Sequence, residues 1–206
     1  DAFLSNGFSL DSSSTAYNAS GSTYASWNWK ANGAGSANTD GSISSTVSAN
    51  ATSGFSIVKW TGTGATGTIG HGLNTAPSCI ITKSFSAAED WGMYHVGIGN
   101  TTNISLNLTS AKYSANSAFW NNTNPTSSLF TVGTHPTINY NTQTMIAYCF
   151  AEKTGYSKFG SYVGNGNADG TFVYTGFAPA FVIVKRTDAA GDWVLFDNKR
   201  PGENPT

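Results

Sequence analysis

Short runs of alternating apolar and polar residues follow one another along the chain, separated by clusters of Gly, Ser, Asn and Thr. Alternation with period two is typical of a strand that buries one face, because successive side chains in a strand point to opposite sides. No segment has the i, i+3, i+4, i+7 spacing of an amphipathic helix. The pattern predicts strands at residues 24–30, 55–61, 78–84, 91–95, 104–107, 129–132, 144–151, 156–162, 171–175, 181–185 and 193–196. Short strands with Gly-rich turns between them favour an all-β fold made of antiparallel β-sandwich or jelly-roll-like units.

The chain also contains an internal repeat of about 100 residues. Residues 60–95 and 162–197 share an aromatic residue, a Gly-x-Gly, a Gly-Thr, an Ala-Pro, an apolar run that ends in Lys, and an Asp-Trp. The landmarks recur 102 residues later: Ala76-Pro77 as Ala178-Pro179, Lys83 as Lys185, and Asp90-Trp91 as Asp192-Trp193. Because proline has no N–H for a strand ladder, each Ala-Pro is expected at the start of a strand.

A weaker similarity relates the beginning of the chain to the second half of this repeat. Residues 7–10 and 23–30 resemble residues 129–132 and 144–150. The expected organisation is the second half of a repeat over residues 1–33, a Gly/Ser/Asn-rich connector over 34–53, a full repeat over 54–154, and the first half of a further repeat over 155–206. The connector has a possible hairpin turn at Asp40-Gly41.

The two half repeats are expected to complete each other. Each alone leaves an apolar face and unpaired strand edges, which folded proteins cover or pair. Completion within one chain and completion by a neighbouring subunit or by further chain both remain open at this point. Association between copies is favoured, because head-to-tail contacts suit a fibre.

Composition narrows the class of protein. Charged residues are 10% of the 206 residues, aromatic residues are 13%, and the formal net charge is -1. No basic patch or polybasic run predicts nucleic-acid or membrane-surface binding, and no apolar stretch is long enough to span a bilayer. A polar, weakly charged chain rich in Gly and aromatics is typical of secreted or virion β-proteins.

No combination of residues predicts an enzyme. Glu89-Asp90 is the one adjacent carboxylate pair, and neighbouring side chains on a strand point apart instead of facing each other across a cleft. Gly62-Thr63-Gly64 and Gly164-Asn165-Gly166 do not lead from a strand into a helix, so they favour turns over phosphate binding. The histidines match no zinc motif; they are His71, His95 and His135.

Two further kinds of site remain as alternatives. Calcium is possible at Asp residues in Gly/Asn/Ala-rich turns, although such turns are common without metal; these residues are Asp40, Asp169, Asp188 and Asp192. Cys79 and Cys149 each lie in an apolar run, which favours two buried thiols, while a disulfide stays open because the sequence does not give their separation.

The aromatic residues divide into two groups. Trp60 and Tyr162 occupy equivalent repeat positions, as do Trp91 and Trp193, and such residues are expected in the core. Trp120 lies in the polar stretch FWNNTNPTSS. It is therefore the aromatic residue expected to be exposed and the candidate ligand-binding residue, through stacking on a sugar ring.

Several motifs together resemble a repeat domain of unknown function found in predicted virion proteins of marine and freshwater bacteriophages. The motifs are YASWNWKANG, GFSIVKWTGTGATGTIGHGLNTAPSCIITK, SAFWNNTNPTSSLFTVG and MIAYCFAEKTGYSKFGSYVGNGNADGTFVYTGFAPAFVIVKRTD. Proteins of this kind look like tail-fibre or related tail components. The resemblance implies an extracellular location in a virion tail or surface appendage, and it carries over no catalytic residue.

The sequence therefore predicts a non-enzymatic virion structural module without a required cofactor. Its expected partners are other copies of itself or other virion proteins, and neither nucleic acid nor membrane. The alternative is a lectin-like module that binds a host glycan or receptor.

Overall fold

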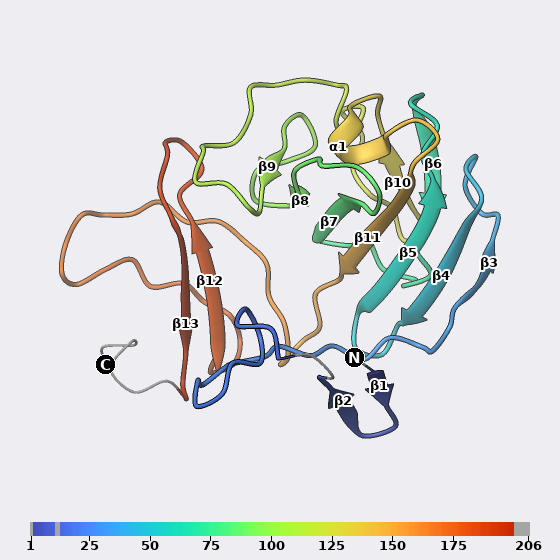
Figure 1. Ribbon diagram of the computed structural model, residues 1–206. Helices are drawn as coiled ribbons and strands as arrows, with labels where there is room; N and C mark the ends of the chain where they lie inside the picture. Colours follow the sequence, from blue (N-terminus) through green and yellow to red (C-terminus); the bar gives the residue numbers. More distant parts are fainter. Residues whose placement is uncertain (1, 11–12, 200–206) are drawn as a thin grey trace.

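A computed structural model describes residues 2–10 and 13–199. Its largest element is an antiparallel seven-stranded sheet, with the strands in the order β3-β4-β5-β11-β7-β8-β9 (Figure 1). The strands are β3 (Ser36–Asn38), β4 (Ser45–Asn50), β5 (Phe55–Thr61), β11 (Thr144–Phe150), β7 (Cys79–Ser84), β8 (Gly92–His95) and β9 (Ile104–Ser105). The central strand β11 lies between β5 and β7, so this sheet joins segments that are far apart in the sequence.

A second, smaller layer covers one face of this sheet. It contains the antiparallel pair β6 (Gly67–Gly70) and β10 (Leu129–Val132), together with the one-turn helix α1 (Pro136–Asn139). The His135 side chain caps α1 by accepting from the Thr137 N–H, and Pro136 occupies a first-turn position. The layers form a β-sandwich, so the all-β antiparallel fold expected from the sequence is confirmed.

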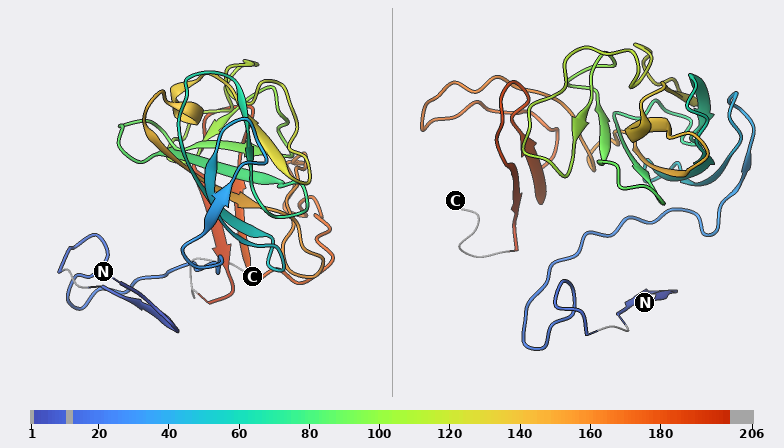
Figure 2. Two further views of the ribbon diagram at one scale, coloured as in Figure 1. Left: turned by 90° about the vertical axis from the view of Figure 1, so that its right-hand side faces the viewer. Right: turned by 45° about the horizontal axis from the view of Figure 1, so that its top comes forward.

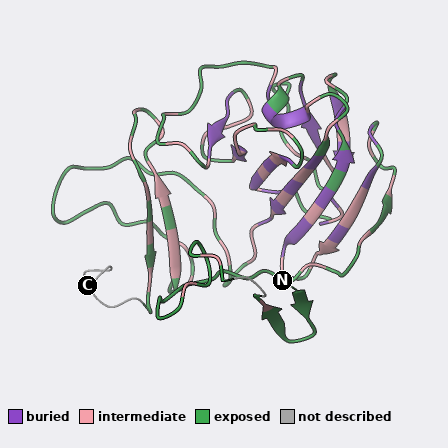
Figure 3. Ribbon diagram, viewed as in Figure 1, coloured by how far each residue is buried: buried purple, intermediate pink, exposed green. Residues whose placement is uncertain are grey.

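The hydrophobic core lies between these layers. Alternation along β5 and β11 turns Val58, Trp60, Met145 and Ala147 inward, and all four are buried. In Figure 3 the buried positions lie in this sandwich, which we call the body and define as residues 34–153. The buried hydrophobic residues among those described run from Ile43 to Ala151. The main core therefore lies between the layers, and a smaller cluster of Cys79, Met93 and Ile104 is separate from it.

Residues 34–53, expected to be a connector, supply part of this body. The hairpin predicted around Asp40-Gly41 is present as β3 and β4, and β4 pairs with β5 along its full length. Ile43, in the turn of the hairpin, joins the core. The apolar pattern alone does not reveal these strands, because β3 and β4 have the polar sequences SAN and STVSAN.

Two segments extend from the body. Residues 2–10 and 13–30, the arm, include the hairpin of β1 (Ala2–Leu4) and β2 (Gly7–Ser9) and lead away from the sandwich (Figure 2). Residues 156–199, the C-terminal half, include the hairpin of β12 (Phe181–Lys185) and β13 (Trp193–Asp197). Residues 1, 11–12 and 200–206, which belong to the predicted half repeats, lie outside the described residues.

The pairing register of one hairpin recurs in the other. In β7 and β8, Cys79 lies opposite His95 and Ile81 lies opposite Met93. In β12 and β13, Phe181 lies opposite Asp197 and Ile183 lies opposite Leu195. Every partner is shifted by 102 residues, so the spacing seen in the sequence coincides with a recurring hairpin register.

The proline positions follow the same spacing. Pro77 lies two residues before β7, and Pro179 lies two residues before β12. Both prolines therefore stand outside the strand ladders at the points where strands were expected to begin.

Some of the predicted strands are present in the structure and others are absent. Those for β5, β10 and β12 are confirmed to the residue, and those for β7, β8, β11 and β13 to within one residue at an end. The expected strands at 24–30, 156–162 and 171–175 are absent. All three lie in the arm or the C-terminal half, and among the described residues none of them has a neighbouring strand along its length.

Candidate association surface

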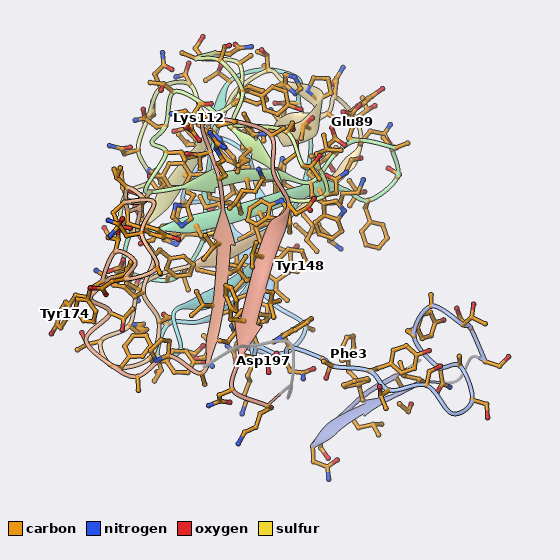
Figure 4. The ribbon with its side chains drawn as sticks, turned by 90° about the vertical axis from the view of Figure 1, so that its left-hand side faces the viewer. Phe3, Glu89, Lys112, Tyr148, Tyr174 and Asp197 are labelled. Atoms are coloured by element: carbon orange, nitrogen blue, oxygen red, sulfur yellow. The ribbon has the colours of Figure 1, made fainter. Side chains whose placement is uncertain are left out.

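Exposed large apolar side chains gather on the arm and the C-terminal half. Among the described residues, only Phe85, Val96 and Tyr113 of this class lie on the body between them. In Figure 4, Phe3 lies on the arm, away from the body, and Tyr174 lies at the outer edge of the C-terminal half. The remaining residues of this class are Leu4, Phe8, Leu10, Tyr17, Tyr24, Trp27, Trp29, Tyr156, Tyr162, Val163, Phe172, Val173, Ile183, Val194 and Phe196. Apolar surface gathered in this way marks interaction sites in soluble proteins.

Two of the exposed residues occupy positions that the sequence comparison aligns with buried residues of the body. Phe8 of the arm is 44% exposed, whereas the residue it resembles, Phe130, is 1% exposed. Tyr162 of the C-terminal half is 51% exposed, whereas its equivalent Trp60 is 3% exposed. These two aligned positions are thus buried in the body and exposed in the arm and the C-terminal half.

Strand β12 also has an unpaired edge. Its repeat equivalent β7 pairs with β8 on one side and with β11 on the other. Among the described residues, β12 pairs with β13 alone. The backbone groups on its second edge are available to another strand.

The hairpin that carries this edge is fixed to the body. Trp193 donates its indole N–H to the carbonyl of Leu108 over 3.1 Å, and the Gly191 N–H donates to Thr109 over 2.8 Å. The Lys112 N–H donates to the carbonyl of Thr187 over 3.0 Å. The unpaired edge of β12 is therefore presented by a hairpin whose tip is held at three backbone positions.

The end of the arm is also attached to the body. Trp29 packs against Phe55 and Phe150, with ring centroids 6.3 and 5.5 Å away. The carbonyl of Lys30 accepts from the Asn50 side chain over 3.1 Å. Trp27 contacts Phe181 at 5.5 Å between centroids. The arm therefore contacts the C-terminal half through these two rings, and no strand pairing joins the described residues of the two segments.

The expectation that Trp120 is exposed is wrong, because its ring is 2% exposed. The loop that carries it turns back over the core, since Asn121 and Asn122 adopt positive φ angles near 51°. Neighbouring Phe119 is tied to Gly133 by a backbone hydrogen bond of 2.6 Å. The indole contacts Tyr94 edge-on and has no face on which a sugar can stack.

The aromatic residues at equivalent repeat positions differ in how far they are buried. Trp60 is in the core, as expected, and its indole N–H donates to the Asn139 side chain. Tyr162, expected in the core, is exposed and lies in no strand. Trp91 and Trp193 are both half-buried, and Trp91 stacks on Tyr148.

The carboxylates considered in the sequence make separate contacts. Glu89 accepts from the Thr137 hydroxyl over 3.3 Å, and Asp90 accepts from the Asn107 amide over 2.9 Å. Asp188 pairs with Arg186 at 2.8 Å on the surface, and this guanidinium lowers the pKa of the Asp188 carboxyl.

Neither the aspartates nor the histidines form a cluster of metal ligands. Within the described ranges, no three His, Cys, Asp or Glu side chains come together as metal ligands. Asp169 and Asp192, which the calcium hypothesis also named, are exposed residues of the C-terminal half. The Asp40 carboxylate accepts a hydrogen bond from the Asn38 side chain.

Both cysteines are buried free thiols. Cys79 faces the outer side of the large sheet, with Met93 and Ile104, and Cys149 faces the main core. Burial raises the pKa of the Cys79 thiol to about 12 and also raises that of Cys149. The interpretation as buried apolar residues is confirmed for both.

A shallow hollow of about 470 Å³ was not predicted from the sequence. It lies between loops of the body, and Tyr94, Asn100 and Asn124 are among the polar residues that line it. Its residues come from separate segments of the chain, so no short sequence motif predicts it.

No helix in the described part of the chain is long and apolar enough to cross a membrane. The family model of a domain of unknown function, DUF7483, matches residues 1–206. No curated protein and no solved structure is significantly similar to the chain.

Proposed function

We propose that this chain, which belongs to the DUF7483 family, is a non-enzymatic structural module of a virion, in a bacteriophage tail fibre or surface appendage. It acts through a rigid β body and association with other subunits. The observation that carries the proposal is the gathering of exposed apolar side chains and unpaired strand edges on the two segments that flank a well-packed sandwich. Such surface is costly to leave in water and is stabilised by contact with a partner.

The virion location in this proposal is supported by the motif resemblance described for the sequence. Electron microscopy of intact phage particles labelled with antibody to this chain tests it. The expected result is label on the tail or on a surface appendage. Purified particles without label, from a preparation in which the antibody detects the purified chain, would sink the proposal.

Glycan or receptor binding is the alternative, and the hollow beside Tyr94 favours it. The amides of Asn100 and Asn124 at its rim are suited to hydrogen bonds with sugar hydroxyls. A glycan array with the wild-type chain and with Asn124→Ala tests this function. Asn141→Ala, on an exposed residue outside the hollow, serves as the control. Binding that is lost in Asn124→Ala alone would support the alternative, and the absence of binding to any host polysaccharide would remove it.

A further inference from the structure

The body shows which strands a complete unit pairs together. Strand β11 inserts between β5 and β7, and β10 pairs with β6. The C-terminal half has the sequence equivalents of β5, β6 and β7, namely residues 157–163, residues 169–172 and β12. The arm has the equivalents of β10 and β11, namely residues 7–10 and 23–29. Each segment therefore lacks the strands that the other contains.

The body also gives the register that such pairing takes. Phe150 of β11 lies opposite Cys79 of β7, and Cys149 lies opposite Ile80. The equivalent positions in the two halves are Trp29 opposite Phe181 and Asn28 opposite Val182. On the other side of the inserted strand, Met145 lies opposite Trp60, which becomes Tyr24 opposite Tyr162.

The chain does not make this pairing with itself. Its own Trp29 packs between Phe55 and Phe150, next to the Lys30 carbonyl that Asn50 binds. As a result Trp27, two residues earlier, is the ring that meets Phe181. A strand that places Trp29 opposite Phe181, from this chain or from another copy, requires the Trp29 contact to open. The rest of the arm projects away from the body in both views of Figure 2, in the direction of solvent and of any neighbouring molecule.

We propose that residues 23–29 of a second copy of this chain add as a strand to the unpaired edge of β12, between β12 and residues 157–163. Residues 7–10 of the same arm lie along residues 169–172. This inference rests on the association part of the proposed function and names its partner and register.

The pairing covers the apolar residues that both halves leave exposed. Main-chain hydrogen bonds supply affinity, and side chains such as Trp27 and Trp29 supply apolar burial and the choice of register, as in other cases of strand addition. Because the arm and the β12 edge are different surfaces of one chain, the contact is head-to-tail and leaves both ends of the assembly able to grow.

Disulfide trapping between two differently labelled chains tests the register. Chains with Asn28→Cys are mixed with isotopically labelled chains that carry Val182→Cys, and the mixture is oxidised under mild conditions. Directly opposite residues in an antiparallel pair have Cα atoms about 4.5–5.5 Å apart, within the range that a disulfide spans. The matched control is Ile183→Cys, which places the thiol on the opposite face of the same strand. The native Cys79 and Cys149 contribute little background, because both are buried.

The expected result is a linked pair of one labelled and one unlabelled chain, at least tenfold more abundant with Val182→Cys than with Ile183→Cys. Equal yields from the two mixtures would overturn the proposed register. A double variant, Asn28→Cys with Val182→Cys, that closes within single chains while the mixtures stay unlinked would overturn the second copy as the partner.

A proline variant tests strand addition without cysteines. Ser26→Pro removes an N–H from the middle of the added strand, and Ser20→Pro is the control in an exposed turn outside it. Light scattering over a concentration series is expected to show multimers of the 21.5 kDa chain for the wild type and Ser20→Pro. The association constant of Ser26→Pro is expected to fall at least tenfold.

The virion location and the strand addition can be overturned independently of each other. A chain that stays monomeric at every concentration, yet is labelled in virions, overturns strand addition alone. A chain that links in register and is absent from virions overturns the virion location and leaves strand addition standing.

Discussion

At the scale of single residues, Asn139 joins the two layers of the sandwich. Its side-chain oxygen accepts from the Trp60 indole at 3.3 Å and from the Thr63 N–H at 3.0 Å. Its amide donates to the carbonyls of Ala65 and Gly133. The side chain is fully buried, and Trp60 and Gly133 are also buried, so these two partners depend on it for a hydrogen bond that water does not readily replace.

Asn139→Ala is expected to lower the free energy of unfolding by about 3 kcal/mol, because the buried Trp60 indole and Gly133 carbonyl lose their partner at once. Chemical denaturation followed by tryptophan fluorescence measures the change. Asn141→Ala, on an exposed side chain two residues away, is the control and is expected to change stability by less than about 0.5 kcal/mol. Equal stability of the two variants would contradict this role of Asn139.

The three histidines share one local arrangement. The ring Nδ1 of His71, His95 and His135 accepts from the backbone N–H two residues later, at 3.2, 3.0 and 3.3 Å. Desolvation lowers the pKa of all three rings. His71 is fully buried, and its Nε2 faces the carbonyl of Thr126 at 3.1 Å. A neutral ring with its proton on Nε2 satisfies both contacts, whereas a second proton on Nδ1 would face the Leu73 N–H.

Stability is therefore expected to fall on acidification. The unfolded chain takes up protons at a histidine pKa of about 6.5, and the folded chain does so at a lower pH. The histidine contribution is fully present above a pH of about 6.5 and is lost as the pH falls from there through the lower pKa values of the folded chain. Urea unfolding at pH 7.5 and 5.5 measures the loss. His71→Asn, whose amide oxygen can still accept from Leu73, is expected to reduce it. A wild-type chain that is more stable at pH 5.5 would contradict the expectation.

At the scale of elements, the end of β5 approaches the segment before β11 closely. Gly62 donates its N–H to Gln143 over 2.8 Å and accepts from Thr142 over 2.8 Å. A Cβ at position 62 would overlap the Tyr140 carbonyl. The repeat equivalent, Gly164, lies in the C-terminal half and has no atom within 4 Å of the same position. The close approach belongs to the complete unit, where the segment before β11 is present.

Gly62→Ala is expected to destabilise the chain by about 3 kcal/mol, because backbone on both sides must shift to accept the methyl group. Gly164→Ala is the matched control and is expected to leave the unfolding of the body unchanged. Thermal unfolding followed by circular dichroism compares them. A larger loss in Gly164→Ala than in Gly62→Ala would contradict the assignment of the packed position.

At the scale of the whole molecule, the chain has a body with a compact core and two flanking segments with few internal partners. Residues 160–178 contain no strand, and almost all of their side chains are exposed. Local opening is easiest where backbone hydrogen bonds and buried contacts are few. The body and the flanking segments should therefore differ in resistance to protease.

Limited chymotrypsin digestion of dilute protein is expected to cut first within residues 162–174 and within the arm, and to leave residues 34–153 intact. Mass spectrometry of the early fragments identifies the sites. The strand-addition proposal further predicts that these early cuts become slower as the protein concentration rises. Early cleavage inside the body would contradict this division of the molecule.

The sequence by itself determined the strands whose apolar runs are strong and whose partners are present. It located β5, β10 and β12, the 102-residue spacing of the two hairpins, and the burial of both cysteines. These features depend on the local pattern of apolar and polar residues, which can be seen directly in the sequence.

Tertiary structure decided the rest. The polar strands β3 and β4 form because β5 offers them an edge, and Trp120 is buried because its loop folds back over the core. Conversely, residues 24–30 and 156–162 have strand-like patterns and form no strand in the single chain. A strand requires a neighbour for its backbone hydrogen bonds, and whether that neighbour is present is a property of the fold and its partners that no local pattern contains.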